Sequence, residues 1–140
     1  MLPFCGYNMG YYFRHWLNIV KRLSHPPKIY SVSWFRTDDD GKFIWPGFGE
    51  NIRVLKWIIE RVNNSVSAKE TPLGLIPDMK DLNVGGLNIP ESKLKKLFEI
   101  DNSEWQTEIK DMEKFFNQFG KRMPAEIMQE YKTLSERCSI

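Results

Sequence analysis

The fold is decided by residues 29–62, which read IYSVSWFRTDDDGKFIWPGFGENIRVLKWIIERV. In residues 29–35 apolar side chains alternate with serines, which is the two-residue period of a β-strand with two unlike faces. Residues 38–41 read Asp-Asp-Asp-Gly, and the glycine can adopt the positive φ that closes a hairpin onto residues 42–45. Residues 54–62 have apolar side chains at helical spacing, which predicts a helix of about three turns.

Further helices are predicted on both sides of this stretch. The apolar spacing predicts an amphipathic helix over residues 8–23, which ends before the Pro26-Pro27 pair. Residues 73–76 predict a short strand, and the glycines and prolines that follow predict irregular structure up to residue 90. The C-terminal part predicts three helices: Ser92–Phe98, Ser103–Phe119 with a Ser103…Gln106 capping box, and Pro124–Arg137 with proline in its first turn.

Two buried stripes are expected on the last two of these helices. They consist of Trp105, Ile109, Met112 and Phe116, and of Ile127, Met128, Tyr131 and Leu134. The sequence therefore predicts a single region over residues 1–140 of the α+β (mixed α/β) class. In it, a short antiparallel hairpin or sheet packs with amphipathic helices, and the C-terminal third is helical.

The composition is that of a folded domain, because 41% of the 140 residues are hydrophobic, 27% charged and 14% aromatic. No apolar run approaches the roughly 20 residues of a membrane-spanning helix, and the N-terminus lacks the pattern of a signal peptide. We therefore expect a protein that is neither exported nor inserted in a membrane. Twenty basic and eighteen acidic residues leave a net charge of +2, which favours no particular charged partner.

The usual catalytic and metal-binding residues give weak signals. His15 and His25 are ten residues apart and do not have metal-ligand spacing, so we interpret both as structural. Cys5 and Cys138 lie at opposite ends of the chain and are expected to be reduced thiols. The three aspartates at 38–40 could bind a cation but are more typical of a solvated turn. Because no phosphate loop of the form G-x-x-x-x-G-K-S/T occurs, other groups would have to hold the phosphates of any nucleotide.

Residues 34–51 contain the one pattern in the sequence that indicates a ligand-binding site. The predicted hairpin and the loop after it bring flat rings together, and Asn51 stands where the next helix begins. Aromatic rings beside an amide are suited to a purine, since stacking one base contributes about 1–3 kcal/mol and a side-chain amide can select its edge. The glycines Gly47 and Gly49 around Phe48 favour this interpretation, because they let the backbone approach a ligand closely.

Two other interpretations remain open at this point. The rings of Phe35, Phe43 and Phe48 could simply be core, in which case the chain is an interaction domain without a ligand. Alternatively, Trp34, Phe43 and Trp45 could stack the bases of single-stranded nucleic acid, although the low net charge weakens this hypothesis. The basic residues beside them would be Lys28, Arg36 and Lys42.

The same stretch, together with the N-terminus, resembles the C-terminal part of GTP-dependent phosphoenolpyruvate carboxykinase. The resemblance rests on Phe4–Gly10, His15–Leu17, Trp34–Arg36 and Phe43–Leu55, and it continues more loosely through Thr71–Pro77 and the terminal helices. One departure is Tyr11, where many relatives carry a charged residue. Enzymes of this family are several hundred residues longer, so the chain resembles a C-terminal region without the upstream catalytic part.

The resemblance implies a function for the whole enzyme. Members of the family convert oxaloacetate and GTP into phosphoenolpyruvate, GDP and CO2 in gluconeogenesis, with Mn2+ or Mg2+ as cofactor. Their phosphate loop, metal ligands and oxaloacetate-binding arginines have no counterpart here, so the isolated chain is expected to be inactive. The implied partners are a guanine nucleotide and the missing N-terminal part, with no nucleic acid and no membrane. The full enzyme is expected to be a cytoplasmic monomer, and the mitochondrion remains a second possible compartment.

The resemblance also assigns site residues. Phe35 and Phe48 would hold the guanine between them, Phe43 would pack against its edge, and Asn51 would form a hydrogen bond with the base. The implied guanine-binding set is Trp34, Phe35, Phe43, Phe48, Gly49, Glu50 and Asn51, with no catalytic residue and no metal ligand.

Overall fold

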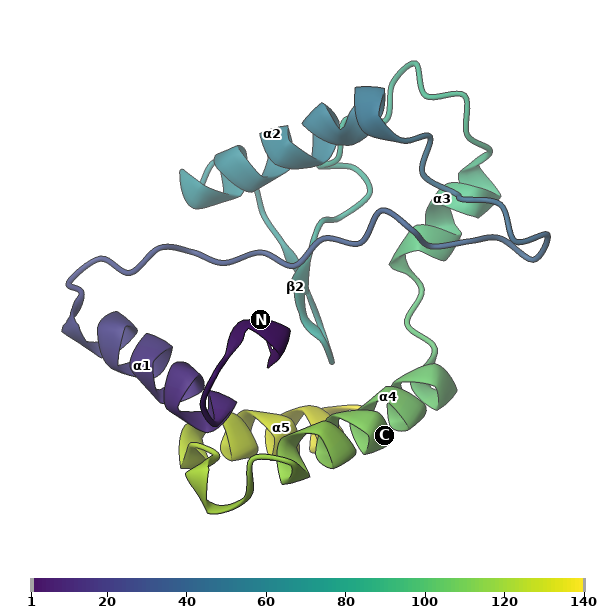
Figure 1. Cartoon of the computed structure of the whole chain (residues 1–140). Helices are drawn as coiled ribbons and strands as arrows, with labels where there is room; N and C mark the ends of the chain where they lie inside the picture. The colour runs from purple at the N-terminus through teal and green to yellow at the C-terminus, as the bar shows by residue number, and fades with distance from the viewer. Residues whose placement is uncertain (1, 140) are drawn as a thin grey trace. The chain divides into compact units, whose positions relative to one another are not determined.

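A computed structural model describes residues 2–139, and its contacts divide the chain into two compact units. The first unit is made of the residues up to Pro27 and those from Asp101 onward, and the second is Lys28–Ile100. Figure 1 shows the elements of both units along the chain. Each unit has its own packing and is described separately.

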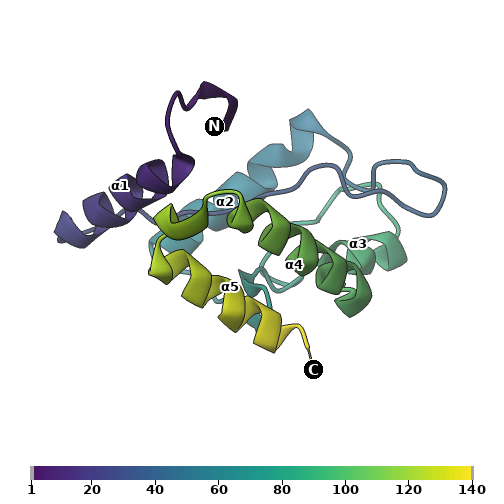
Figure 2. The same cartoon turned by 60° about the horizontal axis from the view of Figure 1, so that its bottom comes forward.

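The first unit is helical in its described part. It contains the short 3-10 helices η1 (Leu2–Phe4) and η3 (Gly120–Arg122), and the helices α1 (Met9–Arg22), α4 (Asn102–Asn117) and α5 (Ala125–Arg137). Helices α4 and α5 lie side by side (Figure 2). The two predicted stripes are confirmed, because all eight of their residues are buried or half-buried.

Aromatic rings and helix caps hold this unit together. Phe119 is 4% exposed and meets the rings of Phe13 and Phe115 edge-on, at centroid distances of 5.6 and 5.1 Å. Helix α1 begins one residue later than predicted, because Asn8 is its cap and its side chain accepts a hydrogen bond from the backbone N–H of Gly10.

The predicted capping box at Ser103 is wrong. The cap of α4 is Asp101, whose Oδ1 accepts from the backbone N–H groups of Ser103 and Glu104 at 2.7 and 3.2 Å. An ionised carboxylate at this position satisfies the free N–H groups and suits the positive end of the helix dipole, so the helix starts one residue earlier. Pro124 likewise occupies the cap position of α5 rather than its first turn.

The second unit combines helices with a small antiparallel sheet. An extended segment and a turn lead to the 3-10 helix η2 (Phe48–Glu50) and helix α2 (Asn51–Val62). Strands β1 (Lys69–Thr71) and β2 (Gly74–Ile76) pair in register Lys69↔Ile76, and α3 (Glu91–Phe98) follows an irregular stretch. The core is built on Trp45, Trp57 and Leu82, each less than 10% exposed, with Tyr30 and Trp34 packed against it.

The structure confirms the α+β class but places the hairpin elsewhere. The predicted strands at 29–35 and 42–45 are wrong, since only an isolated bridge joins Thr37 to Phe43, with a hydrogen bond from the Ile44 N–H to the Arg36 carbonyl. Continuing the ladder would pair Trp34 with Pro46, which has no N–H to donate. The predicted turn is present, with Gly41 at φ +75°, and the strand predicted at 73–76 is confirmed as β2.

Among residues 2–139, no helix has the length and apolar character needed to cross a bilayer.

Candidate functional site

Three phenylalanines of the second unit lie on its surface. Phe35 is 71% exposed, Phe43 is 63% exposed and Phe48 is 94% exposed. Such exposure is inconsistent with the interpretation that these rings are core, because exposed large apolar side chains lose the favourable free energy of burial. Exposed large apolar side chains that lie together are instead typical of a binding surface, and Phe35 and Phe43 form such a pair.

The turn after residue 37 brings two of these rings together. The centroids of Phe35 and Phe43 are 5.8 Å apart and their planes meet at 60°. Phe48 pairs with no other ring among the described residues, so both of its faces are free. In the structure, the ring of Phe35 therefore contacts that of Phe43, whereas the ring of Phe48 on η2 is exposed to solvent.

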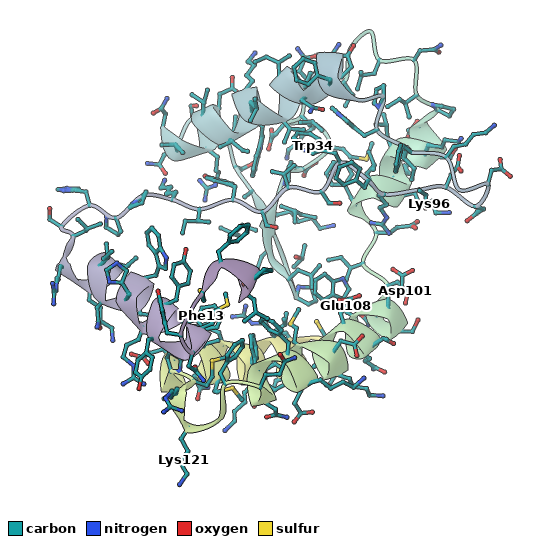
Figure 3. All side chains as sticks on the ribbon, in the orientation of Figure 1. Phe13, Trp34, Lys96, Asp101, Glu108 and Lys121 are labelled. Carbon is teal, nitrogen blue, oxygen red and sulfur yellow. The ribbon has the colours of Figure 1, made fainter. Side chains whose placement is uncertain are left out.

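Trp34 lies on the inner side of this arrangement. Its ring is half-buried and is tilted at 40° to that of Trp45, with 6.3 Å between the centroids. Trp34 therefore packs against the core and is labelled in Figure 3.

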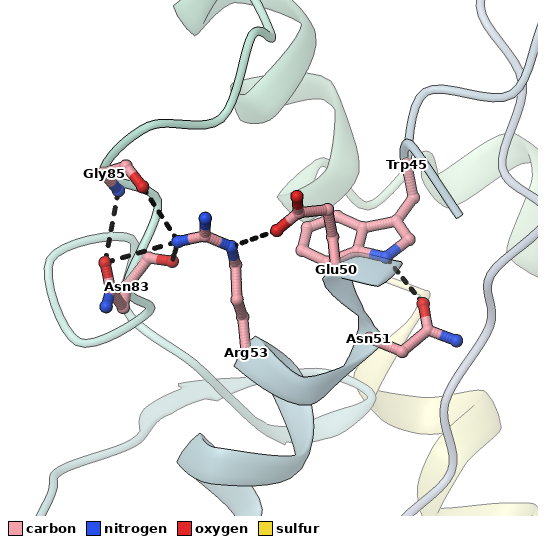
Figure 4. Close-up of polar contacts among 6 residues, drawn as sticks. All are labelled: Trp45, Glu50, Asn51, Arg53, Asn83 and Gly85. Carbon is pink, nitrogen blue, oxygen red and sulfur yellow. Dashed lines mark hydrogen bonds and ion pairs between the residues drawn. The ribbon is translucent and has the colours of Figure 1, made fainter. Parts of the chain in front are cut away.

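Asn51 is the first residue of α2 and is half-buried. Its side-chain Oδ1 accepts a hydrogen bond of 2.9 Å from the indole Nε1 of Trp45 (Figure 4). Trp45 is itself 6% exposed, so the amide of Asn51 is attached to the core of the unit. A helix start is a suitable place for such a group, since the first N–H groups of a helix have no partner within it.

Arg53 connects the loop before α2 to residues 83–85. The guanidinium of Arg53 pairs with the Glu50 carboxylate at 2.5 Å and donates to the carbonyl oxygens of Asn83 and Gly85 at 2.8 and 2.9 Å (Figure 4). Glu50 therefore positions the loop through Arg53. The sequence interpretation did not include Arg53, and the only available signal was the i,i+3 spacing of opposite charges.

The loop conformation also explains one of its two glycines. Gly47 has φ +104° and ψ −159°, a region open to glycine almost alone. Gly49 has no positive φ, and a Cβ there would meet no atom within 4 Å. Only Gly47 is therefore required by the backbone, while Gly49 leaves open space beside Phe48.

The turn that carries Phe43 is attached to α3. The Arg36 guanidinium donates to the carbonyl oxygens of Leu97 and Glu99 at 3.3 and 2.7 Å. Asp38 pairs with Lys93 at 2.6 Å and also accepts from the backbone N–H of Lys42. The hydrogen bond from Lys93, followed by that from Lys42, lowers the pKa of Asp38 from 3.8 to about 2.

This shift predicts a pH dependence of stability. Because the folded-state pKa of Asp38 lies below its usual value, the ionised carboxylate stabilises the folded chain, and this contribution is complete above about pH 4. It is lost as the pH falls through about 2. Urea denaturation of the parent and of Asp38→Asn should differ most above about pH 4 and converge near pH 2. A difference that stays constant across this range would contradict the assignment.

The other candidate residues do not form a site. Within the part of the chain that the structure describes, no three His, Cys, Asp or Glu side chains are close enough to hold a metal ion. Asp38 bonds the backbone of its own turn, as predicted, but its side chain is only 8% exposed and not solvated; Asp39 pairs with Lys96. Tyr11, the residue that departs from the family pattern, accepts a hydrogen bond from Arg122 and lies beneath its guanidinium.

Exposed aromatic rings and a side-chain amide are groups suited to binding a flat heterocyclic base. Comparisons with known proteins show the family of the chain. The family described as phosphoenolpyruvate carboxykinase C-terminal P-loop domain matches residues 1–137. The chain therefore belongs to the phosphoenolpyruvate carboxykinase C-terminal domain family, which confirms the resemblance found in the sequence.

Individual relatives carry the name "Phosphoenolpyruvate carboxykinase [GTP]". The protein from Thermoplasma volcanium is 49% identical over 137 residues, covering 98% of this chain and 23% of the relative. The relative from Chlamydia muridarum is 45% identical, covering 93% of the chain and 22% of the relative. The relative from Neocallimastix frontalis is 44% identical, covering 98% and 23%. The chain thus spans less than a quarter of the length of these relatives.

Proposed function

We propose that residues 1–140 are the guanine-recognition part, within a single C-terminal region, of a GTP-dependent phosphoenolpyruvate carboxykinase. The whole enzyme would convert oxaloacetate and GTP into phosphoenolpyruvate, GDP and CO2. Membership of the family and the names of the relatives support this proposal. The observation that carries it is the exposure of Phe35, Phe43 and Phe48 on the same unit as Asn51.

The proposed binding mode uses the rings for affinity and the amide for selectivity. A guanine held between Phe35 and Phe48, with Phe43 against its edge, would gain stacking on both faces, and each stacked base contributes about 1–3 kcal/mol. Asn51 would then read the edge of the base. Glu50 and Gly49 line the same loop, in which Glu50 is held by Arg53 and Gly49 leaves the approach open.

Phosphoryl transfer and decarboxylation need groups that we do not assign to this chain. The sequence has no phosphate loop of the Walker type, and the described residues do not fit a divalent metal ion such as Mn2+ or Mg2+. We propose that these groups belong to the remainder of a monomeric, cytoplasmic enzyme. Purified chain incubated with oxaloacetate, GTP and Mn2+ is accordingly expected to form no phosphoenolpyruvate, and detectable turnover would contradict this division of roles.

The nucleic-acid alternative is less well supported by the geometry. Of the three cations that this interpretation uses, Arg36 is engaged with carbonyl oxygens at the end of α3 and Lys28 donates to the carbonyl of Val62, which leaves Lys42 as the one whose side chain has no partner among the described residues. A surface that binds single strands needs free cations along the backbone path. Neither the family match nor the names of the relatives point to nucleic acid.

The direct test is a titration of the chain with GDP and, separately, with ADP, followed by intrinsic tryptophan fluorescence. Trp34 precedes Phe35 in the chain and Trp45 is hydrogen-bonded to Asn51, so binding should change their emission. We expect a saturable response to GDP and a much weaker one to ADP. Absence of any response to GDP would show that these residues do not form a binding site by themselves.

A further inference from the structure

Trp45 forms a hydrogen bond with Asn51 that has no part in stacking a base. It is 6% exposed, so its ring belongs to the core rather than to the exposed surface. Its Nε1 nevertheless donates a 2.9 Å hydrogen bond to Oδ1 of Asn51. The neighbouring core tryptophan, Trp57, has a buried Nε1 without a partner among the described residues. A satisfied indole N–H in this core is therefore specific to Trp45.

The chemistry of the indole determines which way the Asn51 amide faces. An indole N–H can only donate, so the amide atom beside it must be the oxygen. The reverse orientation would place two donors against each other and leave both without an acceptor. The amide nitrogen Nδ2 consequently faces away from Trp45 (Figure 4), and it has no hydrogen-bond partner within residues 2–139.

An outward-facing Nδ2 is a donor with no acceptor capacity. Guanine carries the acceptor O6 on its six-membered ring, where adenine carries the amino donor N6. A fixed donor would pair with O6 and would oppose N6, since two donors cannot form a hydrogen bond. An amide that was free to rotate would offer its oxygen to adenine equally well.

We propose that Trp45 is a positioning residue for base selectivity: its indole N–H holds the Asn51 amide so that Nδ2 faces O6 of guanine. This inference rests on the proposed function, because it presupposes that the base lies beside Asn51. What it adds to that function is the buried residue that orients the Asn51 amide.

The test is calorimetric titration of the full chain and of Trp45→Phe with GDP, IDP and ADP. For the parent we expect GDP and IDP to bind with similar affinity and ADP more weakly, because hypoxanthine retains O6 and lacks only the 2-amino group. In Trp45→Phe the preference for GDP over ADP should fall by about fivefold to tenfold, the value of one hydrogen bond. IDP binding as weakly as ADP to the parent would overturn the assignment to O6.

Two variants make the test specific. Trp57→Phe makes the same chemical change in the same core, but its N–H has no partner, so the preference should not change. In an Asn51→Ala background, Trp45→Phe should have no further effect on the preference, because the proposed action passes through Asn51. An unchanged preference in Trp45→Phe that still binds GDP overturns the inference. Absence of GDP binding by the parent would instead count against the proposed function.

A measurement on the parent alone covers the case in which Trp45→Phe does not fold. In 15N-edited NMR spectra the Trp45 indole proton should exchange slowly with D2O. On addition of GDP the Nδ2 protons of Asn51 should shift strongly, while the Trp45 indole proton should remain slow to exchange. Fast indole exchange, or unshifted Nδ2 protons in a GDP-saturated sample, would overturn the inference.

Discussion

Phe48→Ala is expected to lower the affinity of the chain for GDP by about 10- to 100-fold and to leave its stability unchanged. The ring is 94% exposed and pairs with no other aromatic ring of the described chain, so its removal leaves no cavity. The base would lose one of its two stacking faces, a contribution of about 1–3 kcal/mol. Calorimetric titration measures the affinity, and urea denaturation measures the free energy of unfolding.

A second phenylalanine of the chain provides the matched control. Phe13 is half-buried in the first unit and meets the ring of Phe119 edge-on. Phe13→Ala should therefore show the opposite pattern, with a loss of stability of roughly 3 kcal/mol and no effect on GDP affinity in protein that remains folded. If Phe48→Ala lost stability and kept its affinity, the ring would belong to the core and the proposed site would be wrong.

Gly10→Ala is expected to destabilise the first unit by roughly 1–3 kcal/mol, the range for overpacking. A Cβ at residue 10 would lie 2.5 Å from the carbonyl oxygen of Arg122 and 2.8 Å from its carbon, and both atoms belong to the backbone. Helix propensity alone predicts the opposite sign, because alanine favours a helix over glycine by up to about 1 kcal/mol. The sign of the change in urea denaturation therefore tests the close approach of α1 to Arg122.

Gly6→Ala is the control for this substitution. Gly6 does not have a positive φ, and a Cβ there would meet no atom within 4 Å. We expect Gly6→Ala to keep the stability of the parent. A Gly10→Ala variant as stable as Gly6→Ala would show that the contact between Gly10 and Arg122 is not part of the native packing.

The helices were predictable from the sequence because their signal is local. Apolar spacing predicts α1, α2 and the three C-terminal helices to within a few residues of their observed bounds. Strand pairing depends on partners along the whole ladder, which is why the hairpin predicted before Pro46 reduces to one bridge. Strand β1 was missed because Lys69-Glu70-Thr71 has no apolar alternation, and its first two residues are exposed.

Part of the candidate site could likewise be predicted from the sequence and part of it could not. Glycines on both sides of Phe48 indicated an exposed ring, and the ring is exposed. The contacts of Arg53 with Asn83 and Gly85 could not be read from the sequence, because they join residues about 30 positions apart. The bond between Trp45 and Asn51 was hidden for another reason: an aromatic residue predicts stacking or core before it predicts a hydrogen bond.

The most direct test of the central claim is to map GDP binding on the isotope-labelled chain by NMR. We predict that the largest shift changes on GDP addition affect the rings of Phe35, Phe43 and Phe48, the backbone of the 48–51 loop and the side chain of Asn51. Equimolar ADP should produce much smaller changes at the same positions. Changes centred on the helices of the first unit, or equal responses to GDP and ADP, would contradict a guanine-recognition site at this surface.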